Sequence, residues 1–208
     1  MSEGERAPKS SRQYRMTARA EATEARGEKI LDAAEAVFFE EPVEKATLAA
    51  IADEAGVTVQ TVIRRFGSRE DLFGAVLART ALRVSRHRGE ARPGDVEGAA
   101  RVIVEHYEEV GDGVLRLLAQ EERRPALRKL GDAGRAYHRS WCRRVFAPTL
   151  RQLSGVERER RLAQLVAVTD VYTWKLLRHQ AGLSARQTEL AIRELLETLT
   201  ADPRSAAR

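Results

Sequence analysis

Hydrophobic residues recur at three- and four-residue intervals along most of the 208-residue chain, which predicts α-helices. The sequence shows no alternation of apolar and polar residues of the kind that predicts a half-buried strand. The first amphipathic helix is expected at 26–41, where Pro42 stops it. Two short helices around 47–66 and a longer one at 68–86 follow. The pattern therefore predicts an all-α protein.

The second part of the chain predicts further helices with less regular spacing. Pro93 and Gly94 mark a loop at 88–95. Glycines at 111, 113, 131 and 134 weaken helix formation, and Pro148 should kink or unwind its segment. About nine helices are expected in all, and those of this part lie at 96–110, 114–122, within 125–153, at 156–181 and from Ser184 to about 200.

The segment from Thr47 to Phe73 (TLAAIADEAGVTVQTVIRRFGSREDLF) shows the most specific pattern in the chain. Gly56 permits a sharp, left-handed turn between two short helices at little steric cost. Thr58 is placed to cap the second of these helices through its hydroxyl. Ser68 and Asp71, three residues apart, form the outline of a capping box for the helix that follows.

The second short helix has one apolar and one polar side. Val62 and Phe66 lie four residues apart and can both face a core. On the other side, a glutamine can bond bidentately to adenine, a threonine methyl can contact thymine, and an arginine can bond to O6 and N7 of guanine. A short helix of this kind suits the major groove of DNA. The side chains that fit this chemistry are Gln60, Thr61 and Arg64.

This segment resembles the helix-turn-helix of the TetR family of bacterial transcriptional regulators. The resemblance implies a three-helix DNA-binding domain at 23–70 and a larger C-terminal domain at 71–208. Residues 1–22 are polar and basic in composition and are expected to form a mobile arm. The C-terminal domain would bind a small molecule and dimerise through the helices at about 156–200, although these helices could instead be ordinary core. At the positions of the family pattern this chain has Ile51-Ala52, Ala55-Gly56-Val57-Thr58, Thr61-Val62-Ile63, Phe66 and Ser68-Arg69-Glu70-Asp71-Leu72-Phe73.

The resemblance also implies which residues meet DNA. Arg65 and Arg69 take positions that commonly contact phosphate in the family, and Thr47 matches a phosphate-facing cap. Ile63 departs from the pattern, because the family usually has a tyrosine there. Its phosphate contact is lost or moved to Arg64 or Arg65, so which arginine contacts bases stays open. The predicted DNA-binding set is Thr47, Thr58, Gln60, Thr61, Arg64, Arg65 and Arg69.

An effector site among the middle helices is implied as well. Aromatic walls with one or two polar groups suit a small organic ligand. Taken singly, a residue of this kind more often belongs to the core or to a dimer interface. Asp170 is an acid among apolar turns and needs a partner, which could be an arginine, a tyrosine or a cationic ligand. The candidates are Tyr107, Leu118, Tyr137, Trp141, Asp170 and Trp174.

Charge changes this picture only locally. The net charge is +5, but residues 1–69 carry 11 Lys or Arg against 12 Asp or Glu. Five basic residues and no acid lie between Arg6 and Ala20, and three and no acid lie between Val57 and Arg69. These two segments could meet phosphates. The N-terminal arm either contacts DNA or is a solvated tail.

Other chemistry is sparse. His138 and Cys142 lie four residues apart but lack further metal ligands, and no catalytic triad or phosphate-binding loop is present. We therefore expect no enzyme, no metal and no cofactor. The sequence contains no run of 18 apolar residues, no N-terminal secretory signal and a single cysteine. These features predict a cytoplasmic protein without membrane contact.

Together, the sequence favours a homodimeric transcriptional repressor that binds a near-palindromic operator and is released by a small-molecule effector. Two alternatives stay open. One is a regulator of the same fold without a small-molecule ligand. The other is an architectural protein that binds DNA without sequence preference.

Overall fold

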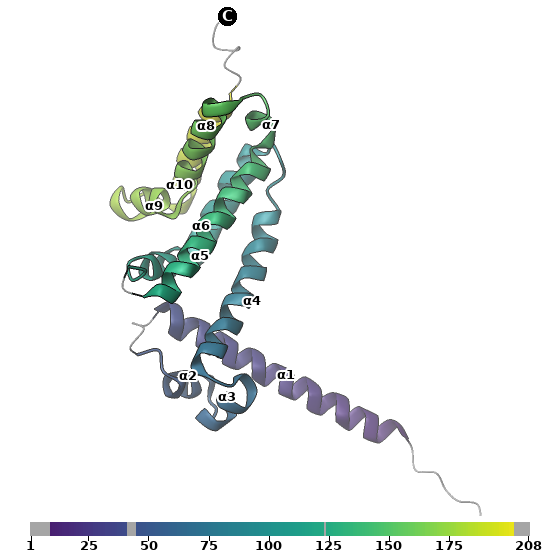
Figure 1. Ribbon diagram of the computed structural model, residues 1–208. Coiled ribbons are helices and arrows are strands. Elements are labelled where there is room, and N and C mark those ends of the chain that lie inside the picture. Colours follow the sequence, from purple (N-terminus) through teal and green to yellow (C-terminus); the bar gives the residue numbers. More distant parts are fainter. Residues whose placement is uncertain (1–8, 41–44, 123, 202–208) are drawn as a thin grey trace, which may run out of the picture. The chain divides into compact units, whose positions relative to one another are not determined.

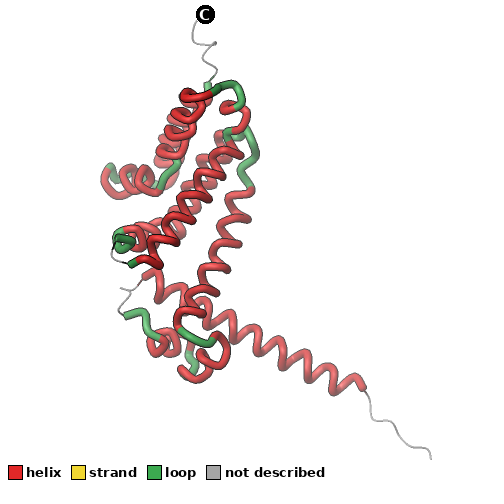
Figure 2. The backbone as a smooth tube through the Cα atoms, viewed as in Figure 1, coloured by secondary structure: helices red, strands yellow, loops and turns green. Residues whose placement is uncertain are grey.

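The computed structural model describes residues 9–40, 45–122 and 124–201. Within these ranges the chain forms ten α-helices and one π-helical turn and contains no strand (Figure 1, Figure 2). The all-α prediction is thereby confirmed. The chain divides into two compact units, of which the first ends at Thr80 and the second begins at Ala81.

The first unit has a small core of aliphatic side chains. Helix α2 packs against α1, and α3 packs against α2. The buried side chains include Ile30, Ile51, Val62, Leu72 and Val76. The helices of this unit are α1 (Lys9–Glu40), α2 (Leu48–Ala55), α3 (Val59–Phe66) and the first part of α4 (Arg69–Gly89).

The prediction for the N-terminus was wrong in its helix boundary. The helix expected from Arg26 begins at Lys9, so the greater part of the supposed basic arm at 1–22 belongs to the 32-residue α1. Residues 1–8 lie outside the described residues. Between Lys9 and Arg26 the sequence has no proline or glycine and is rich in Ala, Arg and Glu, which favour helix. It has no apolar stripe, so hydrophobic periodicity could not reveal it.

The second unit is built around α5 (Val96–Leu118), which packs against α6, α9 and α10. Helices α8 and α10 lie side by side (Figure 1), and α8 also packs on α6. In the described part of the chain, no helix is both long and apolar enough to cross a membrane. The remaining elements are α6 (Pro125–Val145), α7 (Ala147–Leu150), α8 (Gly155–Val168), α9 (Val171–Lys175), the π-helical turn η1 (Leu176–Gln180) and α10 (Ala185–Thr200).

Two helix predictions in this unit were wrong. Helix α5 continues through Gly111-Asp112-Gly113, which had been expected to break it. Gly111 allows the Trp174 ring to pack closely against α5, because a Cβ at this position would lie 2.6 Å from that ring. The helix predicted for 156–181 is interrupted at Thr169-Asp170, and Asp170 caps α9 by accepting a 2.9 Å hydrogen bond from the Tyr172 N–H.

Candidate nucleic-acid interface

The turn between α2 and α3 has the geometry that the sequence predicted. Gly56 adopts a left-handed conformation with φ of 64°, and its N–H bonds to the carbonyls of the last turn of α2. The Thr47 hydroxyl oxygen accepts a 3.2 Å hydrogen bond from the Ala50 N–H. The Thr58 hydroxyl oxygen likewise accepts from the Thr61 N–H at 3.2 Å. Caps at both helix starts hold the two short helices in place although each has only two turns.

Helix α3 presents its polar side to solvent. Val62 is buried in the core of the first unit and Phe66 packs against it. Gln60 and Arg64 are exposed, and the helical period places them opposite Val62. Ile63 lies beside them with 40 % of its surface exposed. An exposed isoleucine on this side gives α3 an apolar contact that could meet thymine methyl groups.

The two adjacent arginines of α3 differ in their surroundings. Arg65 lies 3.8 Å from the Glu24 carboxylate and 5.9 Å from the Phe66 ring centroid. Gly27 on α1 leaves room for it, since a Cβ there would lie 3.1 Å from the Arg65 guanidinium. Arg64 is exposed and forms no hydrogen bond or ion pair with any part of the chain that the structure describes. The geometry therefore leaves Arg64 available for contacts outside the chain and ties Arg65 to α1.

The start of α4, which follows α3 directly, is held by a network of hydrogen bonds between Ser68 and Asp71. The Ser68 N–H and hydroxyl both donate to the Asp71 carboxylate, at 3.1 and 2.7 Å, and the Asp71 N–H donates back to the Ser68 hydroxyl at 3.1 Å. These bonds from Ser68 hold the pKa of Asp71 below its usual value. The expected capping box is present, with aspartate in place of the usual glutamate.

Arg69 has a role within the unit. Its Nε donates a 2.6 Å hydrogen bond to the Ala46 carbonyl, immediately before the Thr47 cap. Its guanidinium also lies 5.5 Å from the Phe38 ring centroid. Arg69 therefore braces the loop that leads into α2, a role that the sequence did not indicate.

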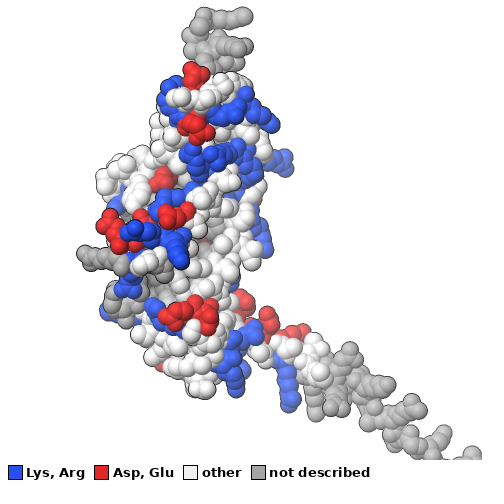
Figure 3. All heavy atoms as spheres, in the orientation of Figure 1, with Lys and Arg blue, Asp and Glu red and all other residues white. Residues whose placement is uncertain are grey.

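Charge on the surface is mixed. On the face that Figure 3 shows, Lys and Arg side chains are interspersed with Asp and Glu, and no single field of one sign covers it. This agrees with the near balance of charges in residues 1–69. Attraction to phosphate must therefore come from local groups such as those on α3, because the bulk charge of the first unit does not supply it.

Two short capped helices joined by a tight turn, with a polar outer side on the second, define a helix-turn-helix DNA-binding protein. Residues 30–76 match the family of bacterial regulatory proteins known as the tetR family. This match assigns the N-terminal part of the chain to the DNA-binding domain of that family. The match spans the last third of α1, all of α2 and α3, and the start of α4.

Solved structures show how far the shared fold extends. A transcriptional regulator from Rhodococcus sp. Rha1 is 18% identical with a TM-score of 0.63, covering 83% of this chain and 94% of that chain. A protein from Rhodococcus sp. assigned to the TetR-family transcriptional regulators is 15% identical with a TM-score of 0.64, covering 85% of this chain and 100% of that chain. At these identities the likeness concerns the fold. The sequence has no match among curated proteins.

The structure brings together only some of the predicted effector-site residues. Tyr107, Tyr137 and Trp141 surround the side chain of Arg88, with each ring centroid 5.6–5.7 Å from the guanidinium carbon. Trp174 packs beside Tyr107, with ring centroids 6.0 Å apart. These aromatic side chains are therefore neighbours, as an effector site would require.

The other two candidates lie elsewhere. Leu118 is the last residue of α5, about 16 Å along the helix from Tyr107 at 1.5 Å per residue. Asp170 points its carboxylate at the Tyr172 N–H as a helix cap. The partner that this acid needs is thus supplied by backbone, and no cationic ligand is required to explain it.

Three polar residues at the aromatic cluster were missed by the sequence analysis. Arg88 had been assigned to a loop, His138 was considered only as a metal ligand, and Thr169 was placed in a continuous helical stripe. In the structure the His138 Nε2 lies 3.1 Å from the Thr169 hydroxyl, which donates to the Leu165 carbonyl at 2.7 Å. An arginine in the last turn of a helix is usual for its favourable charge there, so the sequence carried no signal of its burial.

A metal site is not apparent here. His138 and Cys142 share a side of α6, and the Sγ to Nε2 distance is 3.8 Å. Among the described residues, however, no group of three or more His, Cys, Asp or Glu is placed to hold a metal ion. Burial raises the pKa of the Cys142 thiol to about 11, so it stays protonated at neutral pH.

Proposed function

We propose that this regulator acts as a homodimeric repressor that binds a near-palindromic operator and is released by a small organic effector. The observation that carries the proposal is the exposed pair Gln60 and Arg64 on the side of α3 opposite its core-facing Val62. Two copies of α3 related by a twofold axis would enter successive major grooves of one operator. An operator with two related half-sites follows from that symmetry.

Within each half-site the expected contacts differ in kind. Arg64 can form a bidentate pair with guanine, and Gln60 can do the same with adenine. Arg65 is held by Glu24 and Phe66, so we assign it to the phosphate backbone. Thr47, Thr58 and Arg69 shape the helix ends and the loop before α2, with phosphate contact as a second role.

A dimer through α8 and α10 is supported by small apolar side chains on their solvent side. Leu162, Leu165 and Leu196 are buried within the unit, so part of the predicted apolar stripe is ordinary core. A separate set of apolar side chains is exposed on the outer sides of α8 and α10. It comprises Val156, Ala163, Ala167 and Leu195, with Ala191 partly exposed beside them. Small side chains on adjacent helices allow close packing against a second copy and would complete a four-helix interface.

Release by an effector is supported by the cluster of Tyr107, Tyr137 and Trp141 in the second unit. Helix α4 carries residues of both units, because it begins at Arg69 and ends at Gly89, on either side of the boundary at Thr80. A ligand that prefers one position of α4 would lower DNA affinity by its differential affinity for the two states.

The test is selection of bound sites from random DNA with the wild-type protein and with Arg64→Ala and Arg65→Ala. We expect an inverted repeat for the wild type. Arg64→Ala should relax one position per half-site, at a cost of roughly 1–3 kcal/mol for the preferred base. Arg65→Ala, the matched control on the same helix, should weaken all sequences alike and lower the dependence of affinity on salt.

Two outcomes would contradict this proposal. Equal affinity for selected and scrambled DNA at one salt concentration would favour an architectural protein. A monomer in sedimentation analysis at the concentrations that bind DNA would rule out the dimeric operator complex. Leu195→Glu should separate the dimer, whereas Leu82→Glu, at an exposed leucine of α4, should leave it intact.

A further inference from the structure

Arg88 is a buried arginine at the end of α4. Only 3% of its surface is exposed. One terminal nitrogen donates to the Nδ1 of His138 at 3.0 Å and the other to the Tyr107 hydroxyl at 3.3 Å. An arginine can only donate hydrogen bonds, so Nδ1 of His138 must be the acceptor and the ring proton sits on Nε2. That proton faces the Thr169 hydroxyl at 3.1 Å.

The charge of Arg88 has no counter-charge in the part of the chain that the structure describes. Other arginines of the second unit, such as Arg139 and Arg178, pair with glutamates at 2.6 Å. Arg88 forms no ion pair with any described carboxylate, and its buried Nε has no hydrogen-bond acceptor. The nearby acid Asp170 directs its carboxylate to the Tyr172 N–H. A buried charge without a partner is costly, so a protein that retains one has a use for it.

The titratable groups around Arg88 cannot supply a negative charge at neutral pH. Burial raises the pKa of the Tyr107 hydroxyl to about 12 and that of the Cys142 thiol to about 11, so both stay protonated. Burial and the Arg88 charge lower the pKa of His138 to about 4 and that of His106 to about 2, so both stay neutral. The guanidinium is therefore a positive charge, and Tyr107, Cys142, His106 and His138 around it are all neutral at this pH.

Aromatic rings form the walls around this charge. The rings of Tyr107 and Trp141 are buried, whereas 38% of Tyr137 is exposed. Tyr137 is thus the wall of the cluster that meets solvent. A change of its rotamer would open a path to the unpaired Nε of Arg88 without disturbing the two buried rings.

We infer that Arg88 is the counter-charge for a small organic acid, whose carboxylate binds the guanidinium and whose flat apolar body lies between the aromatic walls in place of the Tyr137 ring. A planar guanidinium matches a carboxylate with two parallel hydrogen bonds. Aromatic side chains on either side favour a flat, apolar ligand body. This inference names the class of the effector and rests on the ligand response proposed above.

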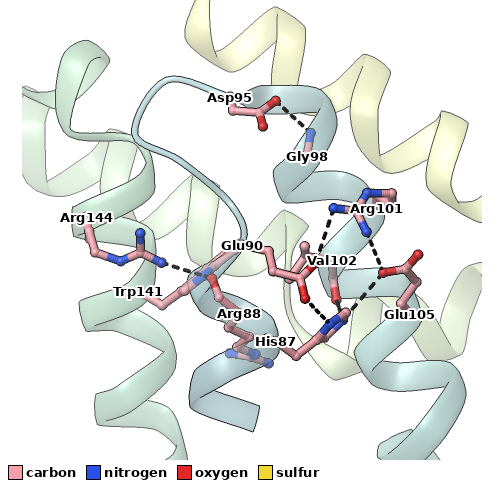
Figure 4. Close-up of polar contacts among 10 residues, drawn as sticks. All are labelled: His87, Arg88, Glu90, Asp95, Gly98, Arg101, Val102, Glu105, Trp141 and Arg144. Carbon is pink, nitrogen blue, oxygen red and sulfur yellow. Dashed lines mark hydrogen bonds and ion pairs between the residues drawn. The ribbon is translucent and has the colours of Figure 1, made fainter. Parts of the chain in front are cut away.

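Binding at Arg88 would act directly on α4. The Arg88 carbonyl accepts hydrogen bonds from the Trp141 Nε1 at 2.9 Å and from Arg144 at 3.0 Å, which tie the end of α4 to α6 (Figure 4). Next to it, His87 lies within 3.6 Å of the carboxylates of Glu90 and Glu105. A carboxylate that draws the Arg88 side chain toward Tyr137 would change these hydrogen bonds at the C-terminal end of α4. The N-terminal end of the same helix begins at Arg69.

The test uses the full chain and pairs of acids and amides of the same shape. Benzoate and phenylacetate are compared with benzamide and phenylacetamide by thermal shift and by tryptophan fluorescence, which reports on Trp141 beside the site. We expect the acids to raise the melting temperature at millimolar concentration and the amides to bind at least about tenfold more weakly. This comparison needs no variant, so it stands even where a substitution impairs folding.

Three variants then locate the binding. Arg88→Met should abolish the preference for acids over amides. Arg101→Met makes the same exchange at an arginine that pairs with Glu105 and should leave the preference unchanged. Tyr137→Ala keeps the charge and removes the ring that the ligand body would replace, so it should still prefer acids to amides and bind benzoate more tightly than the wild type does.

The outcomes separate this inference from the function on which it rests. Equal binding of acids and amides, no binding of either acid at millimolar concentration, or an Arg88→Met protein that still prefers acids would overturn the acid site. Specific DNA binding in the same preparations would then still support the regulator. Acids that bind through Arg88 but do not release selected DNA would support the site and contradict its role in release.

Discussion

Arg64 and Arg88 place the same guanidinium group in opposite surroundings. Arg64 is exposed on a short helix of the first unit and touches no acid of the described chain. Arg88 is buried in the second unit among three aromatic rings. An exposed arginine contributes little to the stability of the fold. Its role therefore depends on the molecule that it binds outside the chain. A buried arginine must be stabilised by its neighbours, so binding and stability become linked there.

The two units differ in the same way as these two residues. The first unit holds its candidate recognition groups on a surface, above a core of aliphatic side chains. The second unit contains all four histidines and both tryptophans of the chain, and it buries polar groups such as His106, His138 and Thr169. Changes in protonation and packing should therefore damage the second unit first, whereas changes to surface and caps should act on the first.

A fall in pH should produce the largest difference in stability between the two units. The pKa of His138 falls from 6.5 to about 4 in the folded protein, mainly through burial and then through the charge of Arg88. The unfolded chain therefore binds more protons over this interval. The stabilisation from neutral His138 is complete above pH 6.5 and is lost as the pH falls through about 4. At about 1.4 kcal/mol per pKa unit, this group alone accounts for about 3 kcal/mol.

The measurement is urea unfolding at a series of pH values followed by tryptophan fluorescence, which reports only on the second unit because Trp141 and Trp174 both lie there. His138→Gln should reduce the pH dependence between pH 6.5 and 4, since glutamine can accept from Arg88 but does not titrate, and His106, whose pKa is lowered to about 2, should account for the dependence that is left. His179→Gln makes the same exchange at an exposed histidine and is the matched control. An unchanged slope in His138→Gln would show that His138 is not the group responsible.

A substitution that overpacks the interior of the second unit should have the next largest effect on stability. A Cβ at Gly111 would lie 2.6 Å from the Trp174 ring, whereas a Cβ at Gly134 would meet nothing within 4 Å. Both glycines lie inside helices, so alanine brings the same gain in helix propensity at each. Gly111→Ala should cost roughly 1–3 kcal/mol through overpacking, and Gly134→Ala should stabilise by about 0.5–1 kcal/mol.

Thermal unfolding of both variants checks this pair. The melting temperature should fall for Gly111→Ala and rise slightly for Gly134→Ala, with altered tryptophan fluorescence only in the first. Stabilisation of both variants would mean that Trp174 moves aside without cost, and that the interior of the second unit is less closely packed than its burial indicates.

These glycines also show where sequence reasoning reached its limit. The caps at Thr47 and Thr58 and the left-handed turn at Gly56 were predicted correctly, because each depends on a few neighbouring residues. The break expected at Gly111 was wrong, because its conformation is set by a tryptophan 63 positions further along the chain. Local propensity is a weak guide where tertiary packing decides.

The candidate sites show the same division. The outer side of α3 followed from helical spacing alone, and the structure added that Arg65 is tied to Glu24 while Arg64 is not. At the aromatic cluster the rings Tyr107, Tyr137 and Trp141 were proposed from the sequence, but the charge between them was missed. No sequence pattern indicates that Arg88, among 36 basic residues, is buried without an acid.

The smallest expected effect concerns the cap of α3, and it tests whether the first unit depends on local interactions. Thr58→Ala removes the hydroxyl that accepts from the Thr61 N–H, at a cost of about 1 kcal/mol. It also removes the 2.9 Å bond between the two threonine hydroxyls, which orients Thr61 on α3. Hydrogen exchange in residues 59–66 should become about fivefold faster, while tryptophan fluorescence in the second unit stays unchanged. Thr58→Ser, which keeps the hydroxyl, should restore most of the protection. If Thr58→Ala instead lowered the melting temperature reported by the tryptophans, the two units would share one cooperative transition, and the contrast between them would concern binding but not stability.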